Sequence, residues 1–165
     1  MNKSIVYLIC LMVLLFVGVT GCGPQDETRT FPNTRYVESY DGVSVAVPEN
    51  PKRILALSSA SDTILLGLVE PDRLVGINTL STYEEYSLEA KRAKLVKPAM
   101  SSYPLEKIIA LDPDLVIAPD YTSADVIAGL RHMGIPTVVV PTGTTVESVI
   151  KNVTDIAHIV GEDEK

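Results

Sequence analysis

Residues 104–118, PLEKIIALDPDLVIA, combine the signals of a short helix and of a buried strand. Pro104 suits the first turn of a helix, because the N–H groups of that turn have no partner inside the helix, and Asp112-Pro113 ends the helical run after Ala110. The apolar residues 115–118 show no polar alternation, which is typical of a parallel strand buried on both faces. The stretch therefore predicts one helix that leads into one central strand.

The same alternation extends to both sides of this stretch. Apolar runs at 54–57, 74–77 and 137–140 predict three further buried strands. Helical spacing and capping residues predict helices over 61–69, capped by Ser61, over 122–133, opened by a Thr122–Asp125 capping box, and over 144–160, opened by a Thr144–Glu147 capping box. Gly134 and Gly161 fit left-handed positions that end the last two helices. Strands that alternate with helices imply an α/β fold with a doubly wound, mostly parallel sheet.

A hairpin and a polar tether precede the sheet. The segments 36–40 and 43–47 flank Asp41-Gly42, and both of these residues tolerate the positive φ of a tight turn. Between Cys22 and Arg35 the chain is polar and rich in turn residues, so we expect a flexible tether.

The first 21 residues have the layout of an export signal. Lys3 precedes a charge-free apolar run that is short for a membrane span, and Val19-Thr20-Gly21-Cys22 resembles a bacterial lipobox. We expect cleavage before Cys22 and lipid attachment to its thiol, which would anchor the protein at the cell membrane, facing the periplasm or the cell exterior. The alternative is an uncleaved N-terminal anchor in which Cys22 has no role.

Composition limits the partners of the exported domain. Cys10 and Cys22 are the two cysteines of the chain, so the domain beyond them must fold without a disulfide. Lys3 is the one basic residue before Cys22, so removal of the leader leaves 13 basic against 21 acidic residues, a net charge of −8. An acidic surface argues against nucleic acid or anionic lipid as the partner.

No catalytic motif is visible in the sequence. It has no Gly-rich phosphate loop, no Gly-x-Ser-x-Gly elbow and no His-x-x-x-His pair. His132 and His158 lie on predicted helices without carboxylates or cysteines at metal-ligand spacing, so we expect surface histidines and no metal site or protein cofactor.

Tyrosines and hydroxyl residues gather where strands end or helices begin. In open α/β sheets ligands bind outside the carboxyl ends of the strands, so these segments should meet at one crevice. Aromatic rings and hydroxyls suit a bulky, partly apolar ligand held by a few hydrogen bonds. The ligand-binding candidates are Ser58, Ser59, Asn78, Thr79, Tyr83, Tyr86, Ser101, Ser102, Tyr103, Tyr121 and Thr122. The alternative is that tyrosine and serine are simply common in loops.

Glu106 and one basic cluster can both be explained by local structure or solvation, without a function. Glu106 lies near the start of a predicted helix, where the helix dipole stabilises a carboxylate by up to ~1 kcal/mol. The basic cluster consists of Lys91, Arg92, Lys94 and Lys97. We expect it to be a solvated helix face and loop, and the less favoured alternative is that it attracts an anionic ligand.

Four segments resemble one family of transport proteins. The segments VPENPKRILALS (47–58), DRLVGI (72–77), LEKIIALDPDLVIA (105–118) and GIPTV (134–138) resemble the solute-binding proteins of ABC importers for iron-siderophore, haem and cobalamin. The match covers residues 41–165 in order and spacing.

This resemblance implies a lipid-anchored receptor and not an enzyme. It implies two α/β lobes joined by a long helix, a metal-chelate ligand that itself contains iron or cobalt, and an ABC permease with a separate ATPase as partners. It also implies that Glu106 docks the lobe onto permease arginines. The implied parts are the signal at 1–21, the lipid-anchored tether at 22–35, a hairpin and entry segment at 36–52, the N-terminal lobe at 53–143 and the start of the interlobe helix at 144–165.

The chain departs from the family pattern at several positions. Asp62-Thr63 replaces a usual Thr-Glu, Val69-Glu70-Pro71 replaces Gly-Leu-Gly, and the segment 97–103 lacks a frequent Gly-Gly or Val-Gly, which leaves the ligand open among siderophore, haem and corrinoid. The family's second lobe has no counterpart in this sequence, so we expect either a fragment of a longer reading frame or the product of a truncated gene. A continuing reading frame would restore a whole receptor, and a stop there would favour a non-functional half-receptor. An exported enzyme on a Rossmann-like sheet is the more distant alternative.

Overall fold

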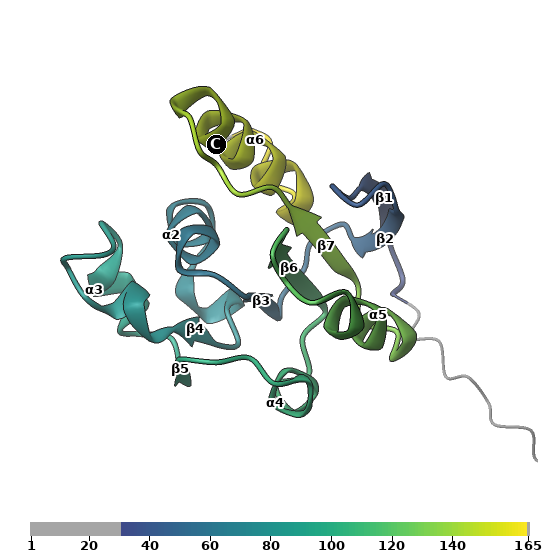
Figure 1. The fold of residues 1–165 in the computed structure, drawn as a ribbon, viewed down its shortest axis with the longest axis horizontal. Helices are drawn as coiled ribbons and strands as arrows, with labels where there is room; N and C mark the ends of the chain where they lie inside the picture. Colours follow the sequence, from purple (N-terminus) through teal and green to yellow (C-terminus); the bar gives the residue numbers. More distant parts are fainter. Residues whose placement is uncertain (1–30, 165) are drawn as a thin grey trace, which may run out of the picture.

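A parallel sheet with helices on both faces forms the centre of the structure, a computed structural model that describes residues 31–164 (Figure 1). Strands β3 (Ile54–Ala56), β6 (Leu115–Pro119) and β7 (Thr137–Val140) pair in parallel in the order β3-β6-β7. Beside β3, a parallel bridge joins Ile54 to Leu74, and the parallel pair β4 (Ile77–Asn78) and β5 (Ala99–Met100) follows.

The winding of the sheet reverses between β3 and β6. From β3 the chain passes to β4 on one side, and it later returns to add β6 and β7 on the other side. The doubly wound fold predicted from the sequence is therefore confirmed. The predicted strand at 74–77 is wrong in its bounds, because Leu74 makes a single bridge and regular pairing starts only at Ile77.

Each face of the sheet has its own apolar core, because successive strand residues point to opposite faces. Helices α2 (Ser59–Leu68) and α6 (Val146–Val160) cover one face, and α4 (Leu105–Ala110) and α5 (Ala124–His132) cover the other (Figure 1). The strand residues of the first core are Ile54, Ala56, Leu115, Ile117, Val138 and Val140. Those of the second are Leu55, Val116 and Ala118.

An antiparallel hairpin packs against the first core. Strands β1 (Thr34–Glu38) and β2 (Ser44–Pro48) pair from Thr34↔Pro48 to Glu38↔Ser44, and Gly42 takes a φ of 77° in the turn. Asp41 in this turn accepts a hydrogen bond of 2.7 Å from Arg131 Nη1 of α5. That bond is the main reason why the pKa of Asp41 is lowered to about 2. The hairpin is thus tied to the helix layer on the opposite face.

Three helix starts differ from the sequence predictions. Helix α2 begins at Ser59, two residues before the predicted range, because Ser58 and not Ser61 is its cap. Helix α5 begins after Ser123 without a side-chain capping bond, so the predicted Thr122–Asp125 box is wrong. Helix α6 is capped by Thr145 and Ser148 instead of Thr144 and Glu147, which shifts the capping box by one residue.

The remaining elements are short. They are the 3-10 turns η1 (Pro71–Arg73) and η2 (Thr79–Thr82) and the single turn α3 (Ala90–Ala93). Between residues 31 and 164, the helices are all too short or too polar to cross a membrane.

Candidate functional site

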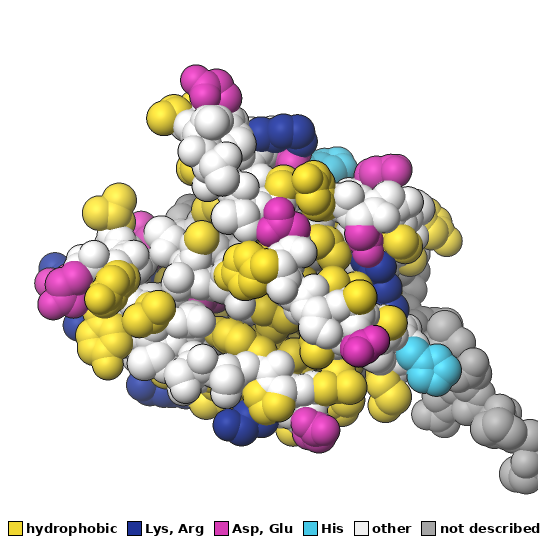
Figure 2. Space-filling view, in the orientation of Figure 1, with side chains coloured by type: hydrophobic (Ala, Val, Ile, Leu, Met, Phe, Trp, Pro, Cys, Tyr) yellow, Lys and Arg dark blue, Asp and Glu magenta, His cyan; other side chains and the backbone are white. Residues whose placement is uncertain are grey.

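A crevice of about 400 Å³ lies where β3, β6 and β7 end. Its walls come from the start of α2, from Tyr86 and from the inner side of α6. The end of β6 adds Pro119 and the following Tyr121, and the end of β7 adds residues 140–143. The start of α6 projects from the body of the molecule and forms one wall (Figure 2). This position is the switch point of the sheet, where the connections of β3 and β6 leave in different directions and open a space between them.

The wall that follows β3, at the start of α2, carries hydroxyl groups that are oriented by hydrogen bonds. The Ser58 hydroxyl accepts a hydrogen bond of 3.2 Å from the Ser61 N–H and donates one of 2.9 Å to the Ser61 hydroxyl. The Thr63 hydroxyl donates to the Ser59 carbonyl over 3.0 Å and lies 2.9 Å from the Ser87 hydroxyl. The turn from β3 into α2 thus presents several oriented hydroxyls to the crevice.

The β7 wall is fixed to the segment after β6. The N–H and the hydroxyl of Thr142 donate to the Asp120 carboxylate over 3.1 and 2.6 Å, and these bonds lower the pKa of Asp120. On α6, Asn152 Nδ2 donates to the Pro141 carbonyl over 2.7 Å. Asn152 is 7% exposed, and its Oδ1 atom is buried without a hydrogen-bond partner.

The structure brings four of the eleven predicted ligand residues to this crevice. Ser58, Ser59, Tyr86 and Tyr121 line it. Thr122 faces a neighbouring hollow beside Asp120 and Arg131. The other six lie elsewhere, either around η2 (Asn78, Thr79, Tyr83) or after β5 (Ser101, Ser102, Tyr103).

A buried polar cluster joins α2 to two of those outlying segments. Asp62 has no exposed surface, and its Oδ2 atom accepts bonds of 2.7 Å from the Asn78 N–H and 2.8 Å from the Ser81 hydroxyl. Burial raises the pKa of Asp62 to about 7. The Tyr103 hydroxyl is also buried, and its pKa is raised by burial and then by the charge of Asp62. Asn78 and Tyr103 therefore support the wall from behind and do not line it.

The ligand-binding residues predicted from the sequence did not include the wall that follows β7. Thr142 and Gly143 directly follow the strand at 137–140, so the strand-end rule that selected Ser58 applies to them equally. Asn152 carried no comparable signal, because it lies within an apolar helical pattern and reaches the crevice only through the packing of α6.

Glu106 lies outside the crevice. Glu106 is exposed in the first turn of α4, on the sheet face opposite α2 and α6. Cys22 falls outside the described residues, as do the predicted signal and most of the tether.

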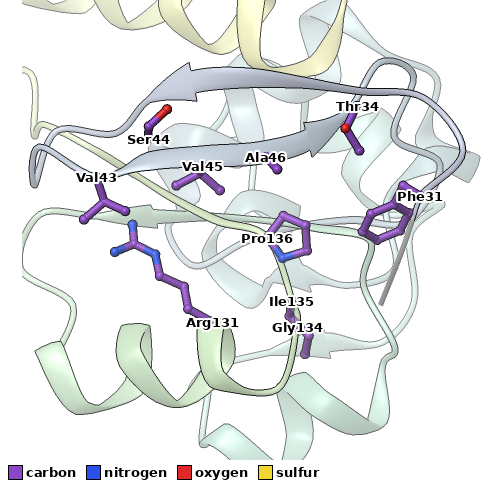
Figure 3. Close-up of a pocket in the computed structure, with 10 residues that line it drawn as sticks. All are labelled: Phe31, Thr34, Val43, Ser44, Val45, Ala46, Arg131, Gly134, Ile135 and Pro136. Atoms are coloured by element: carbon purple, nitrogen blue, oxygen red, sulfur yellow. The ribbon is translucent and has the colours of Figure 1, made fainter. Parts of the chain in front are cut away.

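Two other concave regions lie outside this crevice. One of about 390 Å³ lies between β2 and the α5–β7 connection, and its lining includes Val43, Arg131 and Pro136 (Figure 3). A groove of about 810 Å³ lies between β1 and α6, with Tyr36, Tyr40 and Lys151 on its sides. Within residues 31–164, no group of three or more His, Cys, Asp or Glu side chains is arranged to hold a metal ion.

The chain matches a known protein family and individual proteins of known sequence. The family model described as periplasmic binding protein matches residues 54–165. An ABC transporter substrate-binding lipoprotein of Bacillus subtilis, YvrC, is 30% identical over 93% of this chain and 51% of its own length. The iron(3+)-hydroxamate-binding protein YxeB of the same organism is 28% identical over 98% of this chain and 47% of its own length.

A solved structure agrees with the fold. The periplasmic solute binding protein of Veillonella parvula superposes with a TM-score of 0.67 at 24% identity, over 80% of this chain and 42% of that protein. The chain thus spans about half the length of the relatives that it matches.

Proposed function

The chain belongs to the periplasmic binding protein family, and on this premise we propose that it provides one ligand-binding wall of the substrate receptor of an ABC importer. The observation that carries the proposal is the crevice at the ends of β3, β6 and β7, with its oriented hydroxyls and two tyrosines. Such a wall suits a bulky chelate of the siderophore, haem or corrinoid type, because it offers apolar contact and a few directed hydrogen bonds.

The chain would bind its ligand without changing it chemically. The crevice lining supplies no histidine, cysteine, lysine or carboxylate that could act as a base or nucleophile. The test is equilibrium dialysis of the purified chain against cyanocobalamin, ferrioxamine B and haemin. We expect saturable binding of at least one ligand at one site. Hydrolytic turnover of another substrate by a chain that retains none of these ligands would contradict the proposal.

Glu106 is proposed to dock the lobe onto a basic surface of the permease, the role that the family resemblance implies. Its exposure in the first turn of α4, away from the crevice walls, supports this role, because a partner can reach it while ligand is bound. Glu106→Lys should reduce ligand uptake by at least about tenfold, the effect of ~1.4 kcal/mol at a charged interface, and leave ligand affinity unchanged.

Glu147→Lys is the matched control for that variant. Glu147 is also an exposed glutamate in the first turn of a helix, so its reversal changes the net charge and the helix-end electrostatics in the same way. Uptake and affinity are measured for both variants in cells that contain the permease. A loss of ligand affinity in Glu106→Lys, or an equal loss of uptake in both variants, would contradict the docking role.

The lipid anchor on Cys22 completes the proposal. Attachment to the membrane raises the concentration of the lobe near its permease without any new contact. Labelling with radioactive palmitate should mark the wild-type chain and not Cys22→Ala, and label retained by that variant would exclude Cys22 as the modified residue.

A further inference from the structure

The crevice walls carry no formal charge. Their polar groups are hydroxyls, such as those of Ser58, Thr63 and Thr142, two phenols and the amide of Asn152, and the rest of the lining is apolar. None of the lining side chains is a lysine, arginine, histidine, aspartate or glutamate. A ligand that contacts this wall therefore meets hydrogen-bonding groups and apolar surface, but no counter-ion.

The charges next to these walls are negative. Asp120 lies between the wall residues Pro119 and Tyr121 and is held by two hydrogen bonds from Thr142. Asp62 lies behind the same wall on α2, where burial raises its pKa to about 7, so it adds negative charge only above that pH. An anionic ligand would lose its hydration against this wall and approach Asp120 without a compensating cation, and both effects oppose its binding.

Five basic side chains around the sheet are paired with carboxylates away from the crevice. Arg73 pairs with Glu162 and Arg131 with Asp41, while Lys151 pairs with Asp155 in the groove on the other side of α6. In the basic cluster, Arg92 contacts Glu70 and Lys94 contacts Glu84. These contacts give these five cations partners that do not belong to the crevice wall.

Asn152 adds a specific requirement for a hydrogen-bond donor. Asn152 lines the crevice, and because its Nδ2 atom donates to the Pro141 carbonyl, the orientation of the amide is set and Oδ1 is left as a buried acceptor without a hydrogen-bond partner. A buried acceptor of this kind is costly unless a donor reaches it. An amide N–H of a ligand is a donor of the right kind.

Resting on the proposed function, we propose that this wall selects metal chelates that carry amide N–H groups and no net negative charge. Corrinoids with carboxamide side chains and amide-bearing ferric hydroxamates share this chemistry. Haem carboxylates and ferric catecholates do not, because each presents anionic oxygens.

Equilibrium dialysis against four coloured ligands tests this selectivity. Cyanocobalamin and ferrioxamine B represent the two amide-bearing classes, and haemin and a ferric tricatecholate represent the anionic classes. We expect the full chain to bind at least one amide-bearing ligand ten times more tightly than either anionic ligand. Equal or tighter binding of an anionic ligand would overturn the selectivity and leave the proposed function intact, whereas no saturable binding of any of the four would overturn both.

Two variants locate the selectivity on this wall. Asn152→Leu removes the unpartnered acceptor and should weaken binding of the preferred ligand about tenfold. Ser59→Lys places a cation at the partly exposed first position of α2 and should reduce the preference over the anionic ligands at least fivefold.

Ser123→Lys is the matched control for the added charge. Ser123 caps α5 without a side-chain bond and does not line the crevice, so a lysine there also sits at a helix start. An unchanged preference in Ser59→Lys, or an equal change in Ser123→Lys, would overturn the assignment. The Ser59 variant keeps the test decisive if Asn152→Leu fails to fold.

Discussion

At the scale of single residues, Asp62 couples the stability of the lobe to pH. Its side chain is fully buried, and its two hydrogen bonds from Asn78 and Ser81 do not offset the loss of hydration, so its pKa rises from 3.8 to about 7. In the folded chain Asp62 thus retains a proton over a pH range in which the unfolded chain has released it.

The sign of the resulting pH dependence follows from this difference. Between about pH 4 and 7 the folded state binds more protons than the unfolded state, so the free energy of unfolding falls as the pH rises through this window and levels off above it. The fall should amount to a few kcal/mol, since each pKa unit corresponds to about 1.4 kcal/mol. Urea unfolding at pH 5, 6, 7 and 8 measures it, in a range where Asp41, with its pKa of about 2, does not titrate.

Asp62→Asn should flatten this pH profile, because asparagine keeps an acceptor oxygen but cannot ionise. Asp125→Asn, at an exposed position of α5, controls for the change in net charge. A profile as steep in Asp62→Asn as in the wild type would show that another group is responsible.

The sequence did not reveal this role of Asp62. It showed only that Asp62-Thr63 departs from the family pattern, because burial depends on η2 and the segment after β5 folding over the start of α2. By contrast, Ser58, Ser59, Tyr86 and Tyr121 were predictable as crevice residues. The sequence pattern predicts where a residue lies when that residue directly follows a parallel strand or belongs to a loop near one. It does not predict the burial of a residue that is covered by loops distant in the sequence.

At the scale of elements, the C-terminal end of α6 depends on a glycine. Gly161 has a φ of 76°, and its N–H and that of Glu162 satisfy carbonyl groups of the last turn. A Cβ atom at this position would lie 2.5 Å from the Glu49 carbonyl oxygen and 3.3 Å from Arg35 Nη1. The last turn of α6 and the end of β2 therefore fit together only around a residue without a side chain.

Two glycine substitutions should have opposite effects. Gly161→Ala combines a left-handed backbone with a steric clash and should lower the free energy of unfolding by at least about 2 kcal/mol. Gly67→Ala, at an exposed position of α2 where an added Cβ meets nothing within 4 Å, should raise it by about 0.5–1 kcal/mol. Urea unfolding at one pH compares them, and equal effects of the two substitutions would exclude the proposed role of Gly161.

Element types were easier to predict than element ends. The C-cap at Gly161 was predicted correctly, because only a left-handed residue fits there. The start of the same helix was predicted one residue early, because Thr144–Glu147 and Thr145–Ser148 offer the same capping spacing and the choice depends on how the chain leaves β7. The short strand β5 has no signal in its own sequence and exists through its pairing with β4.

At the scale of the whole molecule, the strand ends form one wall of the crevice, and α6 carries apolar side chains that remain exposed. Val146, Val149, Ile150 and Val153 remain accessible on α6, and Tyr86 and Tyr121 on the crevice rim are 67% and 71% exposed. The lobe has an apolar core on each face of its sheet. The proposed ligand wall is a surface formed at the ends of the strands of this sheet.

The most direct test of this central claim is to map the ligand on the folded chain by ¹H–¹⁵N chemical-shift changes. With cyanocobalamin or ferrioxamine B, we expect the largest changes at Ser58, Ser59, Tyr121, Thr142 and Gly143, and in the side-chain amide of Asn152. Changes that cluster instead along the groove between β1 and α6, or between β2 and the α5–β7 connection, would contradict the assignment of the crevice as the ligand wall.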